Sequence, residues 1–145
     1  MKLLLALFAT LCLSSANATI SSPVDATNRL IAAFNQENVE ILNQLTSAPW
    51  FTIVDGVTTS YDTYGDMIDF AGLKKTGWSS SRARSIEVLH QDKNTAFVNF
   101  VLERLDSSGQ VIFSGPITFV LVNGAEQWKI AGWISGGNQD IPLGK

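Results

Sequence analysis

Hydrophobic and polar positions follow two different periods along the chain. Over residues 23–45, apolar residues recur at the 3.6-residue spacing of an amphipathic helix. The first apolar stripe consists of Leu30, Ile31 and Phe34. Ser22, followed by a proline at the first helical position, can cap this helix, and Asn38 can cap a shorter second one. We therefore predict two consecutive N-terminal helices.

After residue 49 the period changes to two, as in β-strands. The stretch "WFTIVDGVTTS" predicts a hairpin that turns at Asp55-Gly56. Ser60 is placed to cap a third helix over residues 61–72, with Gly72 as its stop. Four strands are then expected, at residues 78–91, 94–106, 110–123 and 125–135. Because short loops join them, these strands should form an antiparallel meander.

This order of elements predicts an α+β fold in which helices cover one face of an antiparallel sheet. The strand at 110–123 is apolar on both faces, so the second face should be buried as well. A homodimer that packs sheet on sheet explains this pattern. With no linker or repeat, residues 24–135 are expected to form a single domain core, followed by a tail at 136–145.

The N-terminus has the pattern of a signal peptide. Lys2 precedes an apolar stretch of 11 residues, and the small-residue sequence "SSANA" follows. Cleavage after Ala18 would remove residues 1–18 and leave an exported protein of residues 19–145, periplasmic or secreted. A retained membrane anchor is the alternative, but 11 apolar residues are short for a stable span. No stable anchor is expected after cleavage.

Composition narrows the chemistry of the mature chain. Cys12 is the only cysteine and lies in the signal peptide, which excludes disulfides, thiol catalysis and cysteine-ligated zinc. With His90 as the only histidine, a protein-held transition metal is not expected. The net charge is −3 for the full chain and −4 once Lys2 is removed, and there is no basic run, which argues against nucleic acid as a partner. We expect no cofactor.

Three stretches together, "LIAAFNQENVEILNQL", "FTIVDG" and "GAEQWKIAGWIS", resemble the nuclear-transport-factor-2-like (NTF2-like) superfamily. This group includes ketosteroid isomerase, SnoaL-type cyclase and DUF4440 families. The resemblance covers about residues 24–135. It implies a cystatin-like cone, in which a curved sheet wraps the N-terminal helices around a central pocket, and dimerisation through the sheet. One fold hosts many functions, so it does not imply a reaction.

The ketosteroid isomerase pattern can be carried over by position. That mechanism needs a carboxylate base and an oxyanion hole made of a tyrosine and a protonated aspartate. In this chain Leu30 stands at the tyrosine position and Thr118 at the aspartate position. The base would fall at Val54 or at Asp55, which the hairpin turn explains better. The isomerase set is therefore not matched.

The same alignment places Thr118 on the face that lines the pocket. The ligand-binding residues that follow from it are Phe97, Asn99, Val101, Ser114, Thr118 and Trp133, with Tyr64 as a further wall residue. Glu103 would share this face, where burial would raise its pKa and prepare it for acid-base work. Alternatively, Glu103 forms an ion pair with Arg82 or Arg84 across the hairpin.

Two functions follow. The first is an exported, non-catalytic, homodimeric domain that binds a small apolar or amphipathic molecule or mediates protein interaction. The second is a cofactor-independent isomerase, cyclase or dehydratase with Glu103 as general base.

Overall fold

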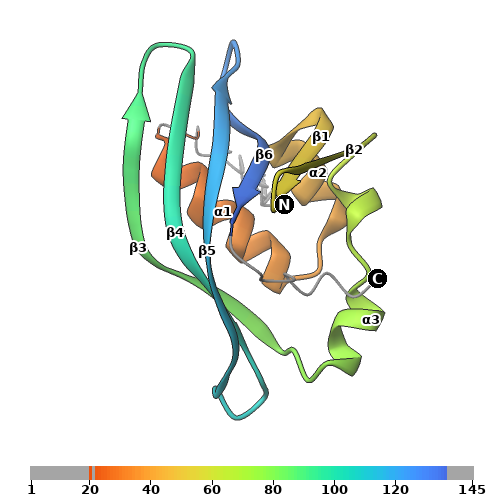
Figure 1. Ribbon diagram of the computed structural model, residues 1–145. Coiled ribbons are helices and arrows are strands. Elements are labelled where there is room, and N and C mark those ends of the chain that lie inside the picture. Colours follow the sequence, from red (N-terminus) through yellow and green to blue (C-terminus); the bar gives the residue numbers. More distant parts are fainter. Residues whose placement is uncertain (1–19, 21, 137–145) are drawn as a thin grey trace, which may run out of the picture.

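Two N-terminal helices lie against one side of a curved, unclosed sheet of six strands (Figure 1). The computed structural model describes residue 20 and residues 22–136 of the 145-residue chain. The predicted signal peptide and residues 137–145 of the predicted tail lie outside the described residues. No helix in the described part of the chain is long and apolar enough to cross a membrane.

Both predicted N-terminal helices and their caps are confirmed. Helix α1 spans Pro23–Asn35, and the Ser22 hydroxyl accepts a hydrogen bond from the Asp25 N–H at 3.1 Å. Helix α2 spans Val39–Leu45, and the Asn38 side chain accepts from the Ile41 N–H at 3.1 Å. These bonds satisfy backbone donors that have no partner within the helix.

The sheet contains the predicted hairpin and the predicted meander. Its strands are β1 (Thr46–Val54), β2 (Val57–Tyr61), β3 (Ser80–Gln91), β4 (Thr95–Leu105), β5 (Val111–Asn123) and β6 (Trp128–Ser135). They lie in the order β2-β1-β6-β5-β4-β3. Every neighbouring pair is antiparallel except β1 and β6, whose parallel pairing joins the hairpin to the meander.

Gly132 allows the backbones of β1 and β6 to approach each other closely. It lies opposite Phe51, and a Cβ atom on Gly132 would lie 2.5 Å from the Phe51 carbonyl oxygen. No side chain fits at that distance, so glycine is required where the two backbones approach.

The predicted third helix at 61–72 is wrong in its bounds. Ser60 belongs to β2, where it pairs with Phe51 instead of capping a helix. A short 3-10 turn, η1 (Gly65–Met67), follows, and helix α3 spans Phe70–Lys75. Pairing with β1 keeps Ser60 extended, and its hydroxyl lies 3.5 Å from the Trp50 carbonyl oxygen, to which it donates, so it does not cap a helix.

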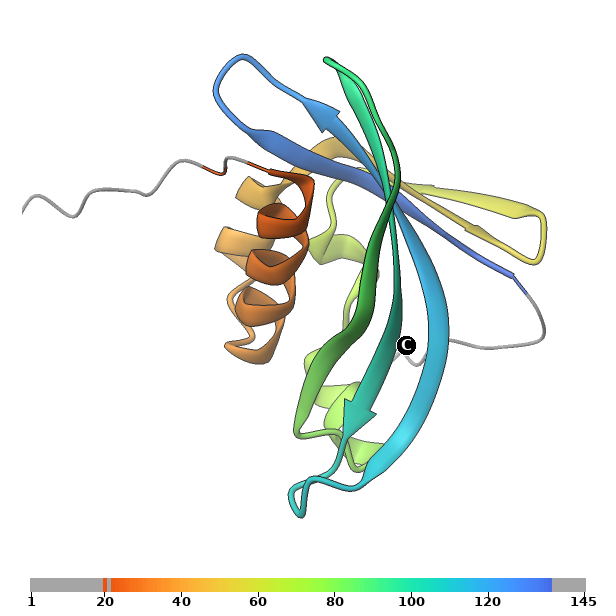
Figure 2. The same cartoon turned by 90° about the vertical axis from the view of Figure 1, so that its left-hand side faces the viewer.

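The two faces of the sheet differ in what covers them. Figure 2 shows α1, α2 and α3 on the same, concave side of the sheet, while no helix of the described residues covers the convex side. Side chains on the concave face are buried against α1, as with Val98 and Phe100 of β4 or Ile117 and Phe119 of β5. The α+β cone predicted from the sequence is confirmed.

Candidate functional site

A small cavity lies between α1 and the concave face of the sheet. Its lining is mainly apolar and comprises Leu30, Ile31, Phe34, Tyr64, Phe100, Leu102, Arg104, Ile117, Phe119 and Trp133. The free space among these side chains is about 10 Å³, which is room for about one water molecule. Larger occupants require the walls to move apart.

Trp133 of β6 brings a buried hydrogen-bond donor to this cavity. Its side chain is 3 % exposed, and its Nε1 has no hydrogen-bond partner among the described residues. The indoles of Trp50 and Trp78 differ, because Trp50 donates to the Met67 sulfur at 3.3 Å and Trp78 to the Ser81 hydroxyl at 2.8 Å. Buried indole N–H groups normally find an acceptor. The Trp133 donor therefore marks a place for one.

Arg104 of β4 brings a buried positive charge to the same cavity. The residue is 3 % exposed, and its guanidinium lies 4.4 Å from the centre of the Phe34 ring. Nη1 donates to the Ser81 hydroxyl at 2.8 Å. Burial lowers the pKa of Arg104 to about 10, with the nearby Tyr64 as a smaller, opposing influence. The guanidinium thus remains charged at neutral pH, held by a cation-π contact and a hydrogen bond.

Tyr64 closes the cavity from the segment between β2 and η1. The next residue, Gly65, fixes this segment: its N–H donates to the Asn43 side chain at 2.8 Å, and a Cβ atom there would lie 2.6 Å from a methyl carbon of Val39. The Tyr64 ring packs edge-on against Trp50 at 4.8 Å. Burial raises the pKa of Tyr64, which the charge of Arg104 only partly offsets. The phenol therefore stays protonated and able to donate.

The polar groups of the cavity are thus an indole N–H, a phenol and a guanidinium. None of the lining residues is a carboxylate or an imidazole. Such a set can bind and polarise a hydrogen-bond acceptor but holds no group that takes a proton at neutral pH. Within the described residues, no three His, Cys, Asp or Glu side chains are grouped so that they could hold a metal ion.

Four predicted site residues on β4 face the convex side instead of the cavity. Phe97, Asn99, Val101 and Glu103 alternate with Ala96, Val98, Phe100, Leu102 and Arg104, which form the buried concave face. The orientation expected from the family alignment is therefore wrong by one residue. On a strand, such a shift moves every side chain to the other face.

The same correction applies to Ser114 and Thr118 on β5. Thr118 pairs with Asn99, and its hydroxyl donates to the Asn99 side-chain oxygen at 3.1 Å on the convex face. Ser114 pairs with Glu103 on that face. Trp133 does lie on the concave face, opposite Phe119, because a register shift between Val120 and Leu121 changes the alternation of β6. Of the predicted pocket residues, only Trp133 and Tyr64 line the cavity.

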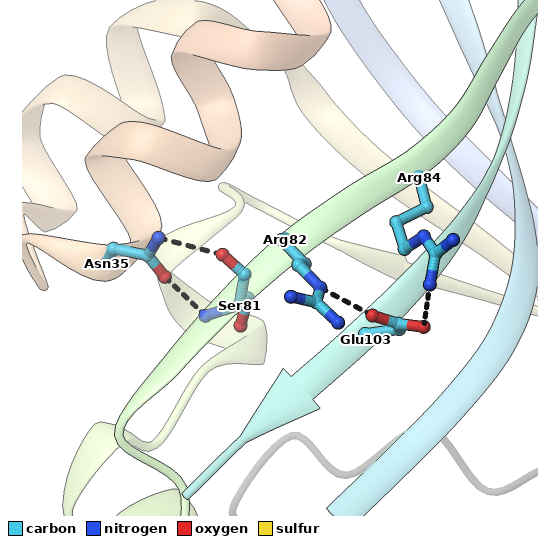
Figure 3. A network of polar contacts seen from close by, with 5 residues as sticks. All are labelled: Asn35, Ser81, Arg82, Arg84 and Glu103. Atoms are coloured by element: carbon cyan, nitrogen blue, oxygen red, sulfur yellow. Dashed lines mark hydrogen bonds and ion pairs between the residues drawn. The ribbon is translucent and has the colours of Figure 1, made fainter. Parts of the chain in front are cut away.

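Glu103 forms the ion pair that was the alternative to catalysis. Its carboxylate accepts a hydrogen bond from Arg82 Nε and lies 3.5 Å from Arg84 Nη1 (Figure 3). Both arginines come from β3, and Arg82 is directly opposite Glu103 in the ladder. The carboxylate is thus engaged on the convex side, away from the cavity.

Sequence reasoning missed Arg104, and the strand itself carried a signal for it. In "AFVNFVLERL", the face with Ala96, Val98, Phe100 and Leu102 is entirely apolar, whereas the other face carries Asn99 and Glu103. The apolar face is the one expected to meet helices. Arg104 continues that face.

Comparisons with known proteins agree with this architecture. The family model described as NTF2-like protein (DUF6841) matches residues 25–138. A comparison with functionally curated proteins gives no significant match.

Several solved structures share the fold at low sequence identity. A protein of unknown function with a cystatin-like fold from Nostoc punctiforme superposes with a TM-score of 0.64 at 10 % identity, covering 83 % of this chain and 91 % of that one. For an NTF2-like protein of unknown function from Shewanella oneidensis, the TM-score is 0.58, the identity 15 %, and the coverage 79 % and 95 %. A ketosteroid isomerase-like protein from Erwinia carotovora has a TM-score of 0.53 and 17 % identity, with coverage of 79 % and 92 %. At such identities the likeness concerns the fold alone.

Proposed function

Since the chain belongs to the NTF2-like protein family DUF6841, we propose that it is an exported, non-catalytic domain that binds a small apolar or amphipathic molecule in the concave cavity. Export rests on the signal-peptide pattern of residues 1–18, with the periplasm or the extracellular space as destination. Binding rests on the cavity between α1 and the sheet.

The observation that carries the proposal is the Trp133 indole N–H, which is buried without a partner in the described part of the chain. Leaving a buried donor unsatisfied costs about 1–3 kcal/mol. A bound molecule with an acceptor removes this cost, and the apolar walls favour a molecule that is otherwise hydrophobic.

Binding fits the site better than the enzymatic alternative. An isomerase, cyclase or dehydratase of the expected kind needs a general base within reach of the substrate. Glu103 was the candidate base, but its carboxylate is paired with Arg82 and Arg84 on the convex face. The groups that line the cavity donate hydrogen bonds and do not accept protons at neutral pH.

Native mass spectrometry of protein purified from an exporting bacterial host tests the proposal. We expect a small molecule to copurify, or small apolar compounds to raise the melting temperature. The matched variant Ile31→Trp enlarges a half-buried wall residue and should abolish both effects while the protein remains folded. Equal thermal responses of wild type and variant would contradict the proposal.

A second candidate function, homodimerisation or binding of a partner protein, is favoured by the convex face. Ile134 and Val122 are 38 % and 37 % exposed there, and they lie near the half-buried Phe97, Val101 and Val120. A sheet face that no described helix covers and that has this composition is typical of an interaction surface. We propose that a second copy of the chain packs on it.

A further inference from the structure

We propose that the ligand of the concave cavity is a compact, mostly apolar molecule with one carbonyl or carboxylate oxygen, which accepts hydrogen bonds from Trp133 Nε1 and from the Tyr64 hydroxyl. This inference rests on the proposed function and names the chemical class of the ligand.

The donors define what the ligand must offer. The Trp133 indole can only donate, so its partner must be an acceptor. Tyr64 as a residue is 2 % exposed, its ring packs against Trp50, and its hydroxyl can donate a hydrogen bond. Trp50 also contacts Trp133, with ring centres 6.2 Å apart, so a single aromatic cluster positions both donors. An oxygen with two lone pairs, as in a carbonyl group, suits two such donors.

The charge of Arg104 favours negative charge on that oxygen. The guanidinium shares the cavity with both donors and is close enough to Tyr64 to influence its pKa. Ser81 Oγ and the Phe34 ring fix its position. In a buried site, a fixed positive charge favours the partial charge of a carbonyl and more strongly the full charge of a carboxylate.

The walls limit the rest of the molecule. The remaining lining is aliphatic or aromatic, as with Leu30, Ile117 and Phe119, and offers no second polar anchor. Since the cavity holds about one water molecule, a small ring or a short branched chain enters only when the walls move apart, which favours a compact ligand. The ligand is therefore expected to carry its polar atoms at one end.

Cyclopentanone and methylenecyclopentane test this inference, because they have the same shape and differ in the acceptor. We expect cyclopentanone to bind about fivefold more tightly than methylenecyclopentane, which corresponds to the net free energy of one hydrogen bond. Only cyclopentanone should move the Trp133 indole N–H resonance downfield in proton–nitrogen NMR spectra. Cyclopentanecarboxylate distinguishes a carboxylate ligand from a neutral carbonyl ligand. If it binds more tightly than cyclopentanone, the ligand is anionic; if it binds more weakly, the ligand is neutral. Both results support the inference.

Two variants give matched controls. Tyr64→Phe removes only the hydroxyl, and Trp133→Phe removes the N–H while keeping an aromatic ring. Each should weaken the binding of cyclopentanone severalfold and should change the binding of methylenecyclopentane, which has no acceptor, much less. Equal affinity of the two probes for wild-type protein would overturn the inference but leave the proposed function standing. If none of the three probes binds, both fail.

Discussion

The side-chain amide of Asn35, the last residue of α1, forms two hydrogen bonds with the backbone of Ser81 on β3 (Figure 3). Nδ2 donates to the Ser81 carbonyl oxygen at 2.9 Å, and the Ser81 N–H donates to Oδ1 at 2.7 Å. The amide thus provides partners for a backbone N–H and a carbonyl group of the edge strand β3, which a further strand would otherwise pair with. It also fixes Ser81, whose hydroxyl accepts from Arg104 and Trp78. The end of α1 is in this way linked to the buried charge of the cavity.

Asn35→Ala should lower the free energy of unfolding by about 1–2 kcal/mol, because two backbone hydrogen bonds are lost. Urea denaturation measures this change. Gln36→Ala is the control, since Gln36 is exposed and its side chain forms no hydrogen bond with another described residue. An equal effect of the two substitutions would show that the Asn35 bonds do not stabilise the fold.

Glu103→Gln should lower stability by less than about 1 kcal/mol, since both arginine partners are at least half exposed and solvent screens the pairs. The difference should shrink in 1 M salt. Ligand binding in the cavity should not change, because Glu103 lies on the other face. Glu87→Gln on the neighbouring strand is the control. Loss of binding or of an enzymatic activity at unchanged stability would instead support a catalytic Glu103.

Tyr64→Phe should alter the pH dependence of stability above pH 10. Burial raises the pKa of Tyr64 in the folded protein, so the unfolded chain loses this proton first. The stabilisation that the Tyr64 hydroxyl gives the folded state is therefore complete below about pH 10, the pKa of tyrosine in the unfolded chain. Above that pH the free energy of unfolding falls by up to about 1.4 kcal/mol per pH unit. Urea titrations of both proteins from pH 9 to 11 isolate this effect. Parallel pH profiles would mean that Tyr64 ionises normally.

Ile134→Lys should prevent dimerisation, because it places a charge on the proposed interface of the convex face. Sedimentation equilibrium at micromolar concentration should give a dimer mass for the wild type and a monomer mass for the variant. Val57→Lys, at the β1–β2 turn and 66 % exposed, should remain dimeric. A monomeric wild-type protein would contradict the proposed dimer.

The sequence predicts the elements of this fold well because their signals are local. Ser22 and Asn38 cap the helices that follow them, and Asp55-Gly56 turns the first hairpin, as their side-chain and backbone preferences require. The signal for where that hairpin ends is less local. Ser60 fits a helix cap equally well, and only pairing with Phe51 assigns it to a strand.

The site was predicted less well because it depends on which face of each strand meets the helices. On β5 both faces are apolar, so alternation does not distinguish them, and the family alignment selected the face of Thr118. On β6 the register shift brings Ile130 and Trp133 to the same face, although they are three positions apart, a spacing that places residues of a regular strand on opposite faces. Such a bulge arises from pairing between strands and leaves no clear mark in either sequence. Arg104 is hard to place from the sequence, because an arginine is seldom buried.

Chemical-shift mapping with cyclopentanone tests most directly whether the concave cavity is the functional site. Shifts are predicted for the Trp133 indole and for amides that line the cavity, including Phe100 and Phe119, with little change at Asn99, Thr118 and Glu103. Shifts centred on these last three residues would place the site on the convex face and contradict the account.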